Sequence, residues 1–344
     1  MELRQLGTSD IQVSALSLGT MTFGEQNSEQ EAHAQLDLAI SHGVNFIDTA
    51  EIYPVPPCAE TQGQTESFVG TWLKHQQRDK LIVATKIAGP SRGFAWIRNG
   101  PRINRQHFQE AIDGSLRRLQ TDYVDLYQIH WPDRYVPMFG GSSYEITQEH
   151  ETEPIVNQLE ALAVLVKAGK VRRIGLSNET PWGVSEFVKC AENFGLPRIV
   201  SVQNSYHLMN RSFESGLAEV CHHAGVSLLA YSPLAFGHLS GKYINEPNVK
   251  GRITLFPAFG QRYTKPNVAT ASKAYARIAQ EFNLSPAQLA LAFARTRWFT
   301  SSVILGASSL KQLKENLDSA EVVLSDEVIG RIEATHTIYT NPAP

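Results

Sequence analysis

The chain has 344 residues, of which 42% are hydrophobic and 19% charged, and this composition excludes an intrinsically disordered protein. Its 31 basic and 34 acidic residues leave a net charge of −3. This balance argues against nucleic acid and against an anionic membrane surface as partners, because both select for an excess of lysine and arginine.

A short hairpin is predicted first, over about residues 2–13, with its turn at Gly7-Thr8-Ser9-Asp10. Eight short apolar runs follow, and most are continuous rather than alternating, as is typical of strands buried on both faces. These runs are Leu16–Met21, Asn45–Ala50, Leu81–Ile87, Val124–His130, Ile174–Asn178, Ile199–Asn204, Ser227–Pro233 and Ser302–Ala307.

Amphipathic stretches separate these runs and predict helices, several of which begin at capping residues. The predicted caps are Ser28 and Ser309, each in a capping box, Thr180 and Ser285, each before a proline, and Ser325, ahead of a last helix that ends near His336. Apolar helix faces are predicted at Phe108, Ile112, Leu116 and Leu119, and again at Leu310, Leu313 and Leu317.

Eight strands that alternate with helices predict an α/β fold, a (β/α)8 TIM barrel with an N-terminal β-hairpin, as a single domain over residues 1–344. The extra length lies in connections at about 53–63, 88–104, 131–153 and 235–265, which a barrel places on its C-terminal face, where active sites form. An open doubly wound sheet is the alternative, weakened because the chain has no G-x-G-x-x-G motif.

The three cysteines, Cys58, Cys190 and Cys221, form no C-x-x-C pair and predict neither a disulfide framework nor a zinc motif. The N-terminal segment lacks the apolar core of a signal peptide, and no apolar run reaches the roughly 18 residues of a membrane span. We therefore expect a cytoplasmic protein with no membrane partner. The oligomeric state stays open.

Four polar residues stand where a barrel places its chemistry. Asp48 ends the second barrel strand, Tyr53 follows it in the loop, Lys86 ends the third strand and His130 ends the fourth. Because these strands are neighbours, their side chains can reach one pocket. A charge at the end of an apolar strand is costly unless it is paired, which predicts an ion pair between Asp48 and Lys86. Each residue alone has an ordinary structural explanation, but four together at one mouth indicate a site.

These residue types suit proton transfer to a carbonyl oxygen. A tyrosine hydroxyl titrates near 10, and an adjacent ammonium lowers that pKa. A carboxylate can hold the ammonium in place, and a histidine beside the phenol can either orient the carbonyl oxygen or share the proton. The set is therefore suited to protonating the oxyanion that forms when hydride reaches a carbonyl carbon.

In this order on successive strands, Asp48, Tyr53, Lys86 and His130 resemble the catalytic tetrad of the aldo-keto reductases. Further segments that resemble the family are Leu18–Gly24, Asp122–Tyr127, Gly175–Asn178, Gln203-Asn204, Tyr231–Leu234 and Gly306–Ser309. The segments Glu51–Pro57 and Tyr339–Pro344 are most similar to the bacterial Tas-like branch, which is related to the potassium-channel β-subunits.

The resemblance implies a role for each residue of the tetrad. Tyr53 would be the general acid in reduction and the base in oxidation. Lys86 would depress the pKa of Tyr53, Asp48 would anchor Lys86, and His130 would orient the carbonyl. The resemblance also implies a nicotinamide cofactor bound across the barrel mouth, with no Rossmann domain.

The cofactor-binding residues are likewise implied by the resemblance. Tyr231 would stack on the nicotinamide ring. The remaining predicted contacts are Ser177, Asn178 and Gln203 at the carboxamide, Gly19, Thr20 and Met21 with Asp48 around the ring and ribose, Ser232, Leu234, Gly237, Leu239 and Lys242 at the pyrophosphate, and Gly306, Ala307, Ser308, Gln312, Glu315 and Asn316 at the adenosine.

One departure from the family bears on the choice of cofactor. Many members place a lysine and an arginine around the adenosine 2′-phosphate, where this chain has Gly306 and Gln312, with Lys311 and Lys314 nearby. The channel-subunit branch shows a similar pattern and uses NADP. We therefore predict NADP(H) rather than NAD(H).

The substrate pocket is predicted at Phe23, Tyr53 and Trp131, with Phe236 and Trp96 as further aromatic candidates. A small-molecule carbonyl compound is the predicted substrate. The glycine-containing stretch 139–143 is either a lid or an inert insertion.

Two functions follow. The first is an NADP(H)-dependent oxidoreductase that reduces aldehydes or ketones to alcohols. The second is a slow-turnover NADP(H)-binding sensor or regulatory subunit, which the resemblance to the channel subunits allows.

Metal chemistry is the rival enzyme class for a barrel with 11 histidines. His130, His207, His222 and His223 are its candidates, but the chain has no H-E-x-x-H motif and no strand-end ligand set. His222 and His223 are expected at the end of a helix, away from the mouth. We predict no metal site, and the lack of a G-x-S-x-G motif also disfavours a serine hydrolase.

Overall fold

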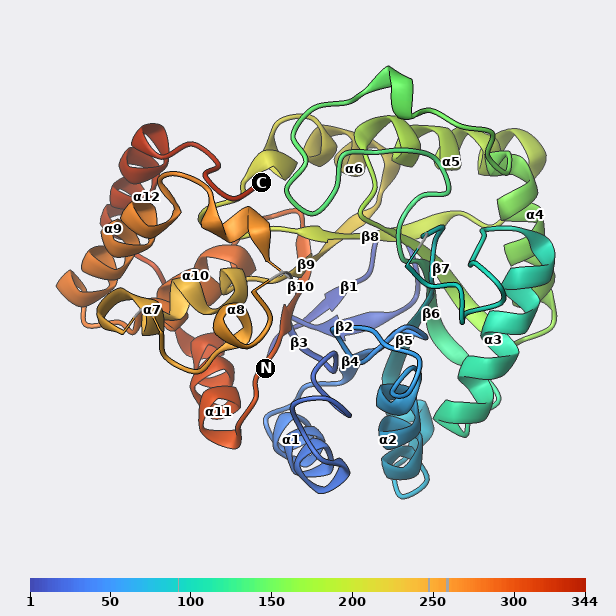
Figure 1. The fold of residues 1–344 in the computed structure, drawn as a ribbon, viewed down its shortest axis with the longest axis horizontal. Coiled ribbons are helices and arrows are strands. Elements are labelled where there is room, and N and C mark those ends of the chain that lie inside the picture. Colours follow the sequence, from blue (N-terminus) through green and yellow to red (C-terminus); the bar gives the residue numbers. More distant parts are fainter. Residues whose placement is uncertain (92, 247, 258–259) are drawn as a thin grey trace.

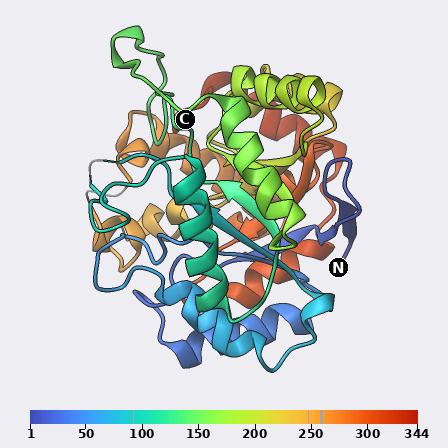
Figure 2. The ribbon, with the colours of Figure 1, turned by 90° about the vertical axis from the view of Figure 1, so that its right-hand side faces the viewer.

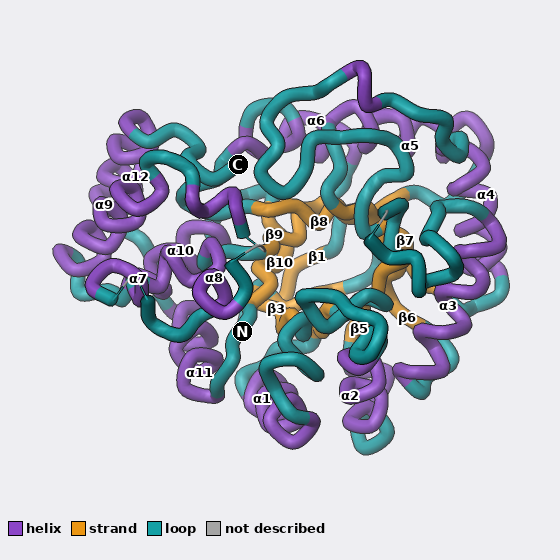
Figure 3. The backbone as a smooth tube through the Cα atoms, viewed as in Figure 1, coloured by secondary structure: helices purple, strands orange, loops and turns teal. Residues whose placement is uncertain are grey.

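Eight parallel strands close into a barrel in the computed structural model, which describes residues 1–91, 93–246, 248–257 and 260–344. The hydrogen-bonded order around the barrel is β10-β3-β4-β5-β6-β7-β8-β9. The strands are β3 (Leu16–Gly19), β4 (Phe46–Asp48), β5 (Ile82–Ile87), β6 (Val124–Ile129), β7 (Val171–Ser177), β8 (Ile199–Ser205), β9 (Ser227–Tyr231) and β10 (Thr300–Leu305). Figure 3 shows them gathered at the centre with the helices around them. The predicted TIM barrel is confirmed.

The predicted N-terminal hairpin is also confirmed. Strands β1 (Leu3–Gln5) and β2 (Gln12–Ser14) pair antiparallel. The apolar residues at its turn, Leu6 and Ile11, pack in one buried cluster with barrel-strand residues such as Phe46 and Leu229. Gly7 at this turn has φ +56°, and a Cβ there would lie 2.2 Å from the carbonyl oxygen of Val200. The hairpin therefore closes one end of the barrel interior at a position that only glycine fits.

The described residues also form α-helices along the chain (Figure 1). They are α1 (Glu29–Ser41), α2 (Gln64–Leu73), α3 (Arg105–Leu119), α4 (Ile155–Lys167), α5 (Pro181–Phe194), α6 (Leu217–Ala224), α7 (Lys242–Asn245), α8 (Arg252–Leu255), α9 (Val268–Glu281), α10 (Pro286–Arg295), α11 (Leu310–Asp318) and α12 (Asp326–Ile338). Short 3-10 turns lie at Arg78–Lys80, Ile146–Gln148, Ser212–Glu214, Ala235–Ser240, Gln261–Thr264 and Ser319–Glu321.

Most predicted helix caps are confirmed. The side chains of Ser28, Thr180, Ser285 and Ser325 each accept a hydrogen bond from the backbone N–H three residues later. The capping box predicted at Ser309 is half wrong. Ser309 accepts from the N–H of Gln312, but the Gln312 side chain accepts from Ser308 instead of returning to Ser309. Leu310, predicted on the apolar face, is 46% exposed, because it opens the helix ahead of its buried side.

Strand β7 begins at Val171, three residues before the predicted start. Its second and third residues are Arg172 and Arg173, which pair with Asp125 and Asp10 respectively. These arginines lie at the end of the barrel opposite the cavity, where their side chains can reach carboxylates. The hydrogen-bonded strand therefore begins before the apolar run.

Parallel register brings the predicted site residues to one level of the barrel. Lys86 pairs with Gln128 across β5 and β6, and Ser177 pairs with Gln203 across β7 and β8. Asp48 ends β4 beside Gly19 of β3. The long connections leave from these same strand ends. Figure 2 shows the green connection between β6 and α4 extending furthest from the barrel. No helix in the described ranges is both long and apolar enough to cross a membrane.

Helices α2 and α3 approach so closely that one glycine decides their spacing. A Cβ on Gly70 would lie 2.1 Å from the carbonyl oxygen of Arg118. We expect Gly70→Ala to lower the free energy of unfolding by about 1–3 kcal/mol, because the backbones must separate. The measurement is urea unfolding followed by circular dichroism.

Gly330→Ala is the matched control. Gly330 lies in the exposed face of α12, where an added Cβ meets nothing within 4 Å. The same substitution there should stabilise the protein by up to about 1 kcal/mol, because alanine is the better helix former. Equal effects of the two substitutions would contradict the packing explanation.

Candidate active site

A cavity of about 1350 Å³ opens at the C-terminal ends of the barrel strands. Among the residues that line it are Asp48 of β4, Tyr53 in the loop after β4, His130 directly after β6 and Tyr231 at the end of β9. The connections after β5, β6 and β9 contribute further walls, as do residues at the ends of β3 and β10 and at the start of α11. The cavity is therefore where the sequence predicts chemistry.

The centre of the site is a buried ion pair. The Nζ of Lys86 donates to Oδ2 of Asp48 at 2.6 Å and to the carbonyl oxygen of Thr49 at 2.7 Å. The other carboxylate oxygen of Asp48 accepts from Nε2 of Gln203 at 2.8 Å and from Nε2 of Gln128 at 3.2 Å. The predicted pairing of Asp48 with Lys86 is confirmed. Removing one partner from such a pair costs about 3–5 kcal/mol, because it leaves a buried charge unpaired.

Tyr53 and His130 lie over this pair. The Lys86 Nζ is 5.0 Å from the centroid of the Tyr53 ring, and the Tyr53 and His130 ring centroids are 5.6 Å apart, edge to face. The structure thus brings all four residues of the predicted tetrad together. Tyr53, His130 and Asp48 line the cavity, while Lys86 is wholly buried behind them.

The surroundings keep the Tyr53 hydroxyl protonated. Burial raises the pKa of Tyr53 well above its ordinary value, and the charge of Asp48 raises it further, while Arg252 opposes the rise. Burial likewise lowers the pKa of Lys86, and Asp48 opposes that change. The net direction for the pKa of Tyr53 is therefore opposite to the lowering predicted from the sequence, because burial and the charge of Asp48 outweigh the lowering effect of Arg252.

His130 is held neutral. Burial, together with the charge of Lys86, lowers the pKa of its imidazole well below the ordinary value. Its ring packs on Trp131 with centroids 4.9 Å apart, and the Asn178 side chain donates to its carbonyl oxygen at 2.9 Å. Nδ1 of His130 is buried and has no hydrogen-bond partner in the described part of the chain. A buried polar atom without a partner at a cavity indicates a place for a ligand atom.

The ends of β7, β8 and β9 form the next part of the cavity. The Tyr231 hydroxyl donates to Oδ1 of Asn178 at 2.7 Å, and Ser177 Oγ donates to the carbonyl oxygen of Gln203 at 2.8 Å. Asn178 has φ +53°, a conformation that its short polar side chain tolerates. These hydrogen bonds hold Ser177, Asn178 and Tyr231 at one wall of the cavity, where Ser177 and Asn178 are predicted to contact the carboxamide.

Four basic side chains line the cavity from the segment 242–262, which follows β9. They are Lys242, Lys250, Arg252 and Arg262, and none forms an ion pair with a described residue. Of the four, only Lys242 is predicted from the sequence. The signal for the other three was basic residues in the connection after the seventh barrel strand, and their spacing did not show which side chains turn inward.

Arg252 and Lys242 lie close to predicted cofactor contacts and to glycines. The Arg252 guanidinium carbon lies 4.8 Å from the Phe236 ring centroid, and its Nη1 is 3.5 Å from Sδ of Met21. A Cβ on Gly237 would lie 2.4 Å from Cε of Lys242, and one on Gly251 would lie 2.7 Å from its Nζ. The Lys242 side chain therefore sits in a cradle that two glycines keep open, beside the cavity.

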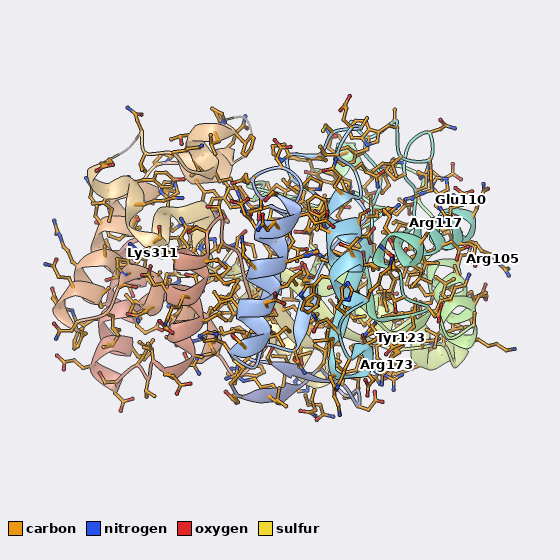
Figure 4. The ribbon with its side chains drawn as sticks, turned by 90° about the horizontal axis from the view of Figure 1, so that it is seen from below. Arg105, Glu110, Arg117, Tyr123, Arg173 and Lys311 are labelled. Atoms are coloured by element: carbon orange, nitrogen blue, oxygen red, sulfur yellow. The ribbon has the colours of Figure 1, made fainter. Side chains whose placement is uncertain are left out.

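The predicted adenosine contacts lie around the start of α11. Oε1 of Gln312 accepts from the N–H and Oγ of Ser308, each at 3.1 Å. The carbonyl oxygen of Gly306 accepts from Asn316 at 3.4 Å. Lys311 is exposed on α11 (Figure 4) and lies outside the cavity lining. Lys314 is also outside the lining and pairs with Asp318 at 2.8 Å.

Most predicted cofactor residues line the one cavity. These are Gly19, Thr20, Met21, Asp48, Ser177, Asn178, Gln203, Tyr231, Ser232, Leu234, Gly237, Lys242, Gly306, Ala307, Ser308, Gln312, Glu315 and Asn316. Leu239 is the exception, because its side chain is 2% exposed and packs in the core.

The predicted substrate pocket is partly corrected. Tyr53, Trp131 and Phe236 line the cavity, but Phe23 is fully buried in the core beside α1, and Trp96 is 41% exposed outside the lining. The pocket wall that sequence analysis did not identify consists of Ile52, Val55, Pro57, Pro90, Phe94, Met138 and Phe139. An apolar residue in a loop gives no periodic signal, so its direction depends on the fold.

The histidines considered for metal chemistry lie apart. His207 is buried in the core, and burial with the nearby charge of Arg262 lowers its pKa to about 3. His222 and His223 are exposed in the last turn of α6. Within the described ranges, no group of three or more His, Cys, Asp or Glu side chains could hold a metal ion.

Comparisons with known proteins agree with this geometry. A sequence model described as "Aldo/keto reductase family" matches residues 15–336. The chain is 51% identical to Protein tas of Escherichia coli (strain K12), over the full length of both. It is 42% identical to an aldo-keto reductase of Babesia bovis, over 76% of this chain and 98% of that protein. It is 30% identical to the uncharacterized oxidoreductase YrpG of Bacillus subtilis (strain 168), over 96% and 94%.

Burial of His207 makes stability depend on pH. The folded state holds this histidine neutral down to a pKa of about 3, whereas the unfolded chain protonates near 6.5. The unfolded state therefore binds more protons below pH 6.5, and stability falls as the pH is lowered through that window. When the pH is lowered from 7.5 to 5.5, His207 should reduce the free energy of unfolding by about 1.4 kcal/mol. The reason is that pH 5.5 lies one unit below the pKa of histidine in the unfolded chain, and one unit corresponds to about 1.4 kcal/mol.

His207→Asn tests this assignment, since its side-chain oxygen can still accept from the backbone N–H of Met209 as Nδ1 does. Urea unfolding at the two pH values should show a fall in stability that is about 1.4 kcal/mol smaller in the variant. The exposed His223→Asn serves as the control and should leave the pH dependence as it is in the original chain. An undiminished fall in the His207 variant would contradict the assignment.

Proposed function

The chain belongs to the aldo/keto reductase family, and on that basis we propose that it is an NADP(H)-dependent oxidoreductase that reduces aldehydes or ketones to alcohols. The observation that carries the proposal is the convergence of Asp48, Lys86, Tyr53 and His130 at the mouth of one cavity. A small-molecule carbonyl compound is the proposed substrate.

The residues present fit a nicotinamide dinucleotide. The Nδ1 of His130 lacks a partner among the described side chains and backbone, and Lys242 sits in its glycine cradle. Ser177, Asn178, Gln203 and Tyr231 would hold the nicotinamide end, and the residues around Ser308 and Gln312 would hold the adenosine end. When bound, the reduced cofactor supplies the hydride that is added to the carbonyl carbon.

Tyr53 would supply the proton in the same reaction. Its raised pKa keeps the hydroxyl protonated at neutral pH, so it can donate to the carbonyl oxygen as negative charge develops there. The ammonium of Lys86 would stabilise the tyrosinate that remains, and Asp48 would hold Lys86 in place. The neutral imidazole of His130 would orient the carbonyl oxygen. In the oxidative direction Tyr53 would accept the proton.

The charge of the cavity supports NADP(H) over NAD(H). Lys242, Lys250 and Arg252 have no carboxylate partner among the residues that the structure describes, and a phosphate-rich cofactor would supply their counter-charge. The Gly306 and Gln312 pattern supports the same choice by its resemblance to NADP-using relatives. The three free cysteines support a place in the reducing cytoplasm.

Tyr53→Phe tests the proton donor. The variant should bind NADPH as the original chain does, because the phenyl ring keeps its packing, and should lose about 10²- to 10⁴-fold in turnover, because the acid is missing. The measurement is oxidation of NADPH by a panel of aldehydes and ketones, with cofactor affinity read from protein fluorescence.

Tyr135→Phe is the matched control, since Tyr135 lies outside the cavity lining. It should leave turnover unchanged. Unchanged turnover in the Tyr53 variant would overturn the assignment. Tight NADPH binding by the original chain without carbonyl-dependent oxidation would instead favour the slow-turnover sensor.

Cofactor choice has its own prediction. NADPH should bind at least about 10-fold more tightly than NADH at low ionic strength, since an extra phosphate meets unpaired cations. The preference should shrink as salt rises from about 0.05 to 0.5 M, because partly exposed charges are screened. Fluorescence titrations with both nucleotides measure it, and equal affinities would reject NADP(H) as the preferred cofactor.

A further inference from the structure

Resting on the proposed reductase activity, we propose that Arg262 binds an anionic group of the substrate and that the substrate class is carbonyl compounds that carry a carboxylate. Arg262 lines the same cavity as Tyr53 and His130, and its side chain is 8% exposed. It lies in the 3-10 turn Gln261–Thr264, in the connection between β9 and α9.

The charge of Arg262 is not neutralised within the described structure. No carboxylate of a described residue pairs with it, although it is among the most buried arginines. Comparable arginines elsewhere in the protein are paired. Arg98 contacts Glu51 at 2.6 Å, and Arg211 contacts Glu214 at 2.8 Å. A buried cation is costly without a counter-charge, so its lone position on a cavity wall indicates an anionic ligand.

The acidic side chains of the cavity cannot serve Arg262. They are Glu25, Asp48 and Glu315. Asp48 forms an ion pair with Lys86, and the two glutamate side chains are exposed to solvent, so none of the three neutralises Arg262. The positive charge also reaches His207, whose pKa it helps to lower to about 3. The field at this wall is therefore positive.

Aromatic rings hold the guanidinium in place. Its central carbon lies 5.6 Å from the Phe139 ring centroid and 5.8 Å from that of Tyr263. Contact with Arg262 also lowers the pKa of Tyr231 against the larger raising effect of burial. Apart from its hydrogen bond with Tyr231, the Arg262 guanidinium has no hydrogen bond to a described residue, so its other N–H groups suit charge-assisted binding of a carboxylate.

The backbone fixes this position through a contact between two distant connections. Lys265 donates to the carbonyl oxygen of Gly140 at 2.6 Å, and a Cβ on Gly140 would lie 3.0 Å from Cβ of Arg262. Gly140 belongs to the connection after β6, which also carries Trp131 beside His130. The stretch considered above as a lid or an inert insertion thus forms part of the Arg262 wall.

Arg262 lies on the substrate side of the site rather than with the other cations. It contacts Phe139, which belongs to the connection after β6 that also carries Trp131, the residue packed on His130. Lys242 lies instead beside Gly237 and Gly251, and Arg252 contacts Met21 of the predicted cofactor set. The two groups of cations therefore suit different ligands, the first the substrate and the second the cofactor phosphates.

Apolar side chains next to this wall complete the substrate class. Trp131, Phe94 and Met138 pack in one buried cluster and line the cavity. A ring or chain that joins a carbonyl to a carboxylate would lie against them. The carboxylate is unchanged in the reaction, in which the carbonyl carbon accepts hydride from NADPH and its oxygen accepts a proton.

The test compares a charged substrate with its neutral isostere. The original chain should reduce 4-carboxybenzaldehyde with a kcat/KM about 10- to 100-fold above that for 4-formylbenzamide, since only the carboxylate forms charge-assisted bonds with Arg262. In Arg262→Gln this preference should disappear through a rise in KM for the charged aldehyde. Arg262→Lys should restore part of it, because a point charge remains.

Two controls accompany the variant. Arg105→Gln removes the same charge from the exposed face of α3 (Figure 4) and should leave kcat/KM unchanged for both substrates. The NADPH affinity of Arg262→Gln should stay within about 2-fold of the original, as expected of a residue outside the cofactor site. A parallel loss of NADPH affinity would overturn the proposal and assign Arg262 to the cofactor.

A binding measurement separates this proposal from the proposed activity. Titration calorimetry with benzoate and benzamide, in the presence of NADP⁺, should show binding of benzoate that Arg262→Gln abolishes. That result without any carbonyl reduction would retain the anion site and reject the reductase. Reduction of both aldehydes with equal efficiency, and no benzoate binding, would reject the anion site and retain the reductase.

Discussion

The buried pair between Asp48 and Lys86 is the interaction on which the rest of the site depends. An ammonium enclosed by a barrel is unstable without a counter-charge, and Asp48 supplies it at 2.6 Å. Two glutamines from β6 and β8 complete the hydrogen bonds of the carboxylate. The pair therefore ties four strands together at one level and presents a positive charge beneath the Tyr53 ring. The ion pair is therefore needed both for a stable barrel interior and for the proposed proton transfer by Tyr53.

The connection after β9 performs the opposite task. It brings basic side chains to the cavity and leaves them without carboxylate partners in the described part of the chain. Such charges lower stability until ligands neutralise them. The protein thus combines a paired charge at its centre with cations on the cavity wall that lack carboxylate partners among the described residues. Pairing fixes the proton-transfer groups, and the unpaired cations provide affinity for phosphate and carboxylate groups.

The parts of the structure that the sequence predicted well depend on local or strictly periodic signals. Continuous apolar runs marked the barrel strands, and serine or threonine before a helix marked four caps. Errors arose where a longer-range contact outweighed the local pattern. The start of β7 was missed because Arg172, a charged residue outside the apolar run, pairs with Asp125 of the neighbouring strand β6. Phe23 was predicted in the substrate pocket and Leu239 at the cofactor, but both side chains pack in the core.

By itself, the sequence determined the barrel, the order of its strands and the identity of the four central residues, because strand ends of a parallel barrel meet at one face. It also indicated which family the chain resembles. Only the tertiary structure decided that burial raises the pKa of Tyr53 rather than lowering it, and that Arg262 lines the cavity beside Tyr231. Desolvation and unpaired charge depend on what surrounds a side chain on every side. Those surroundings come from connections far apart in the chain, whose paths carry no periodic signal.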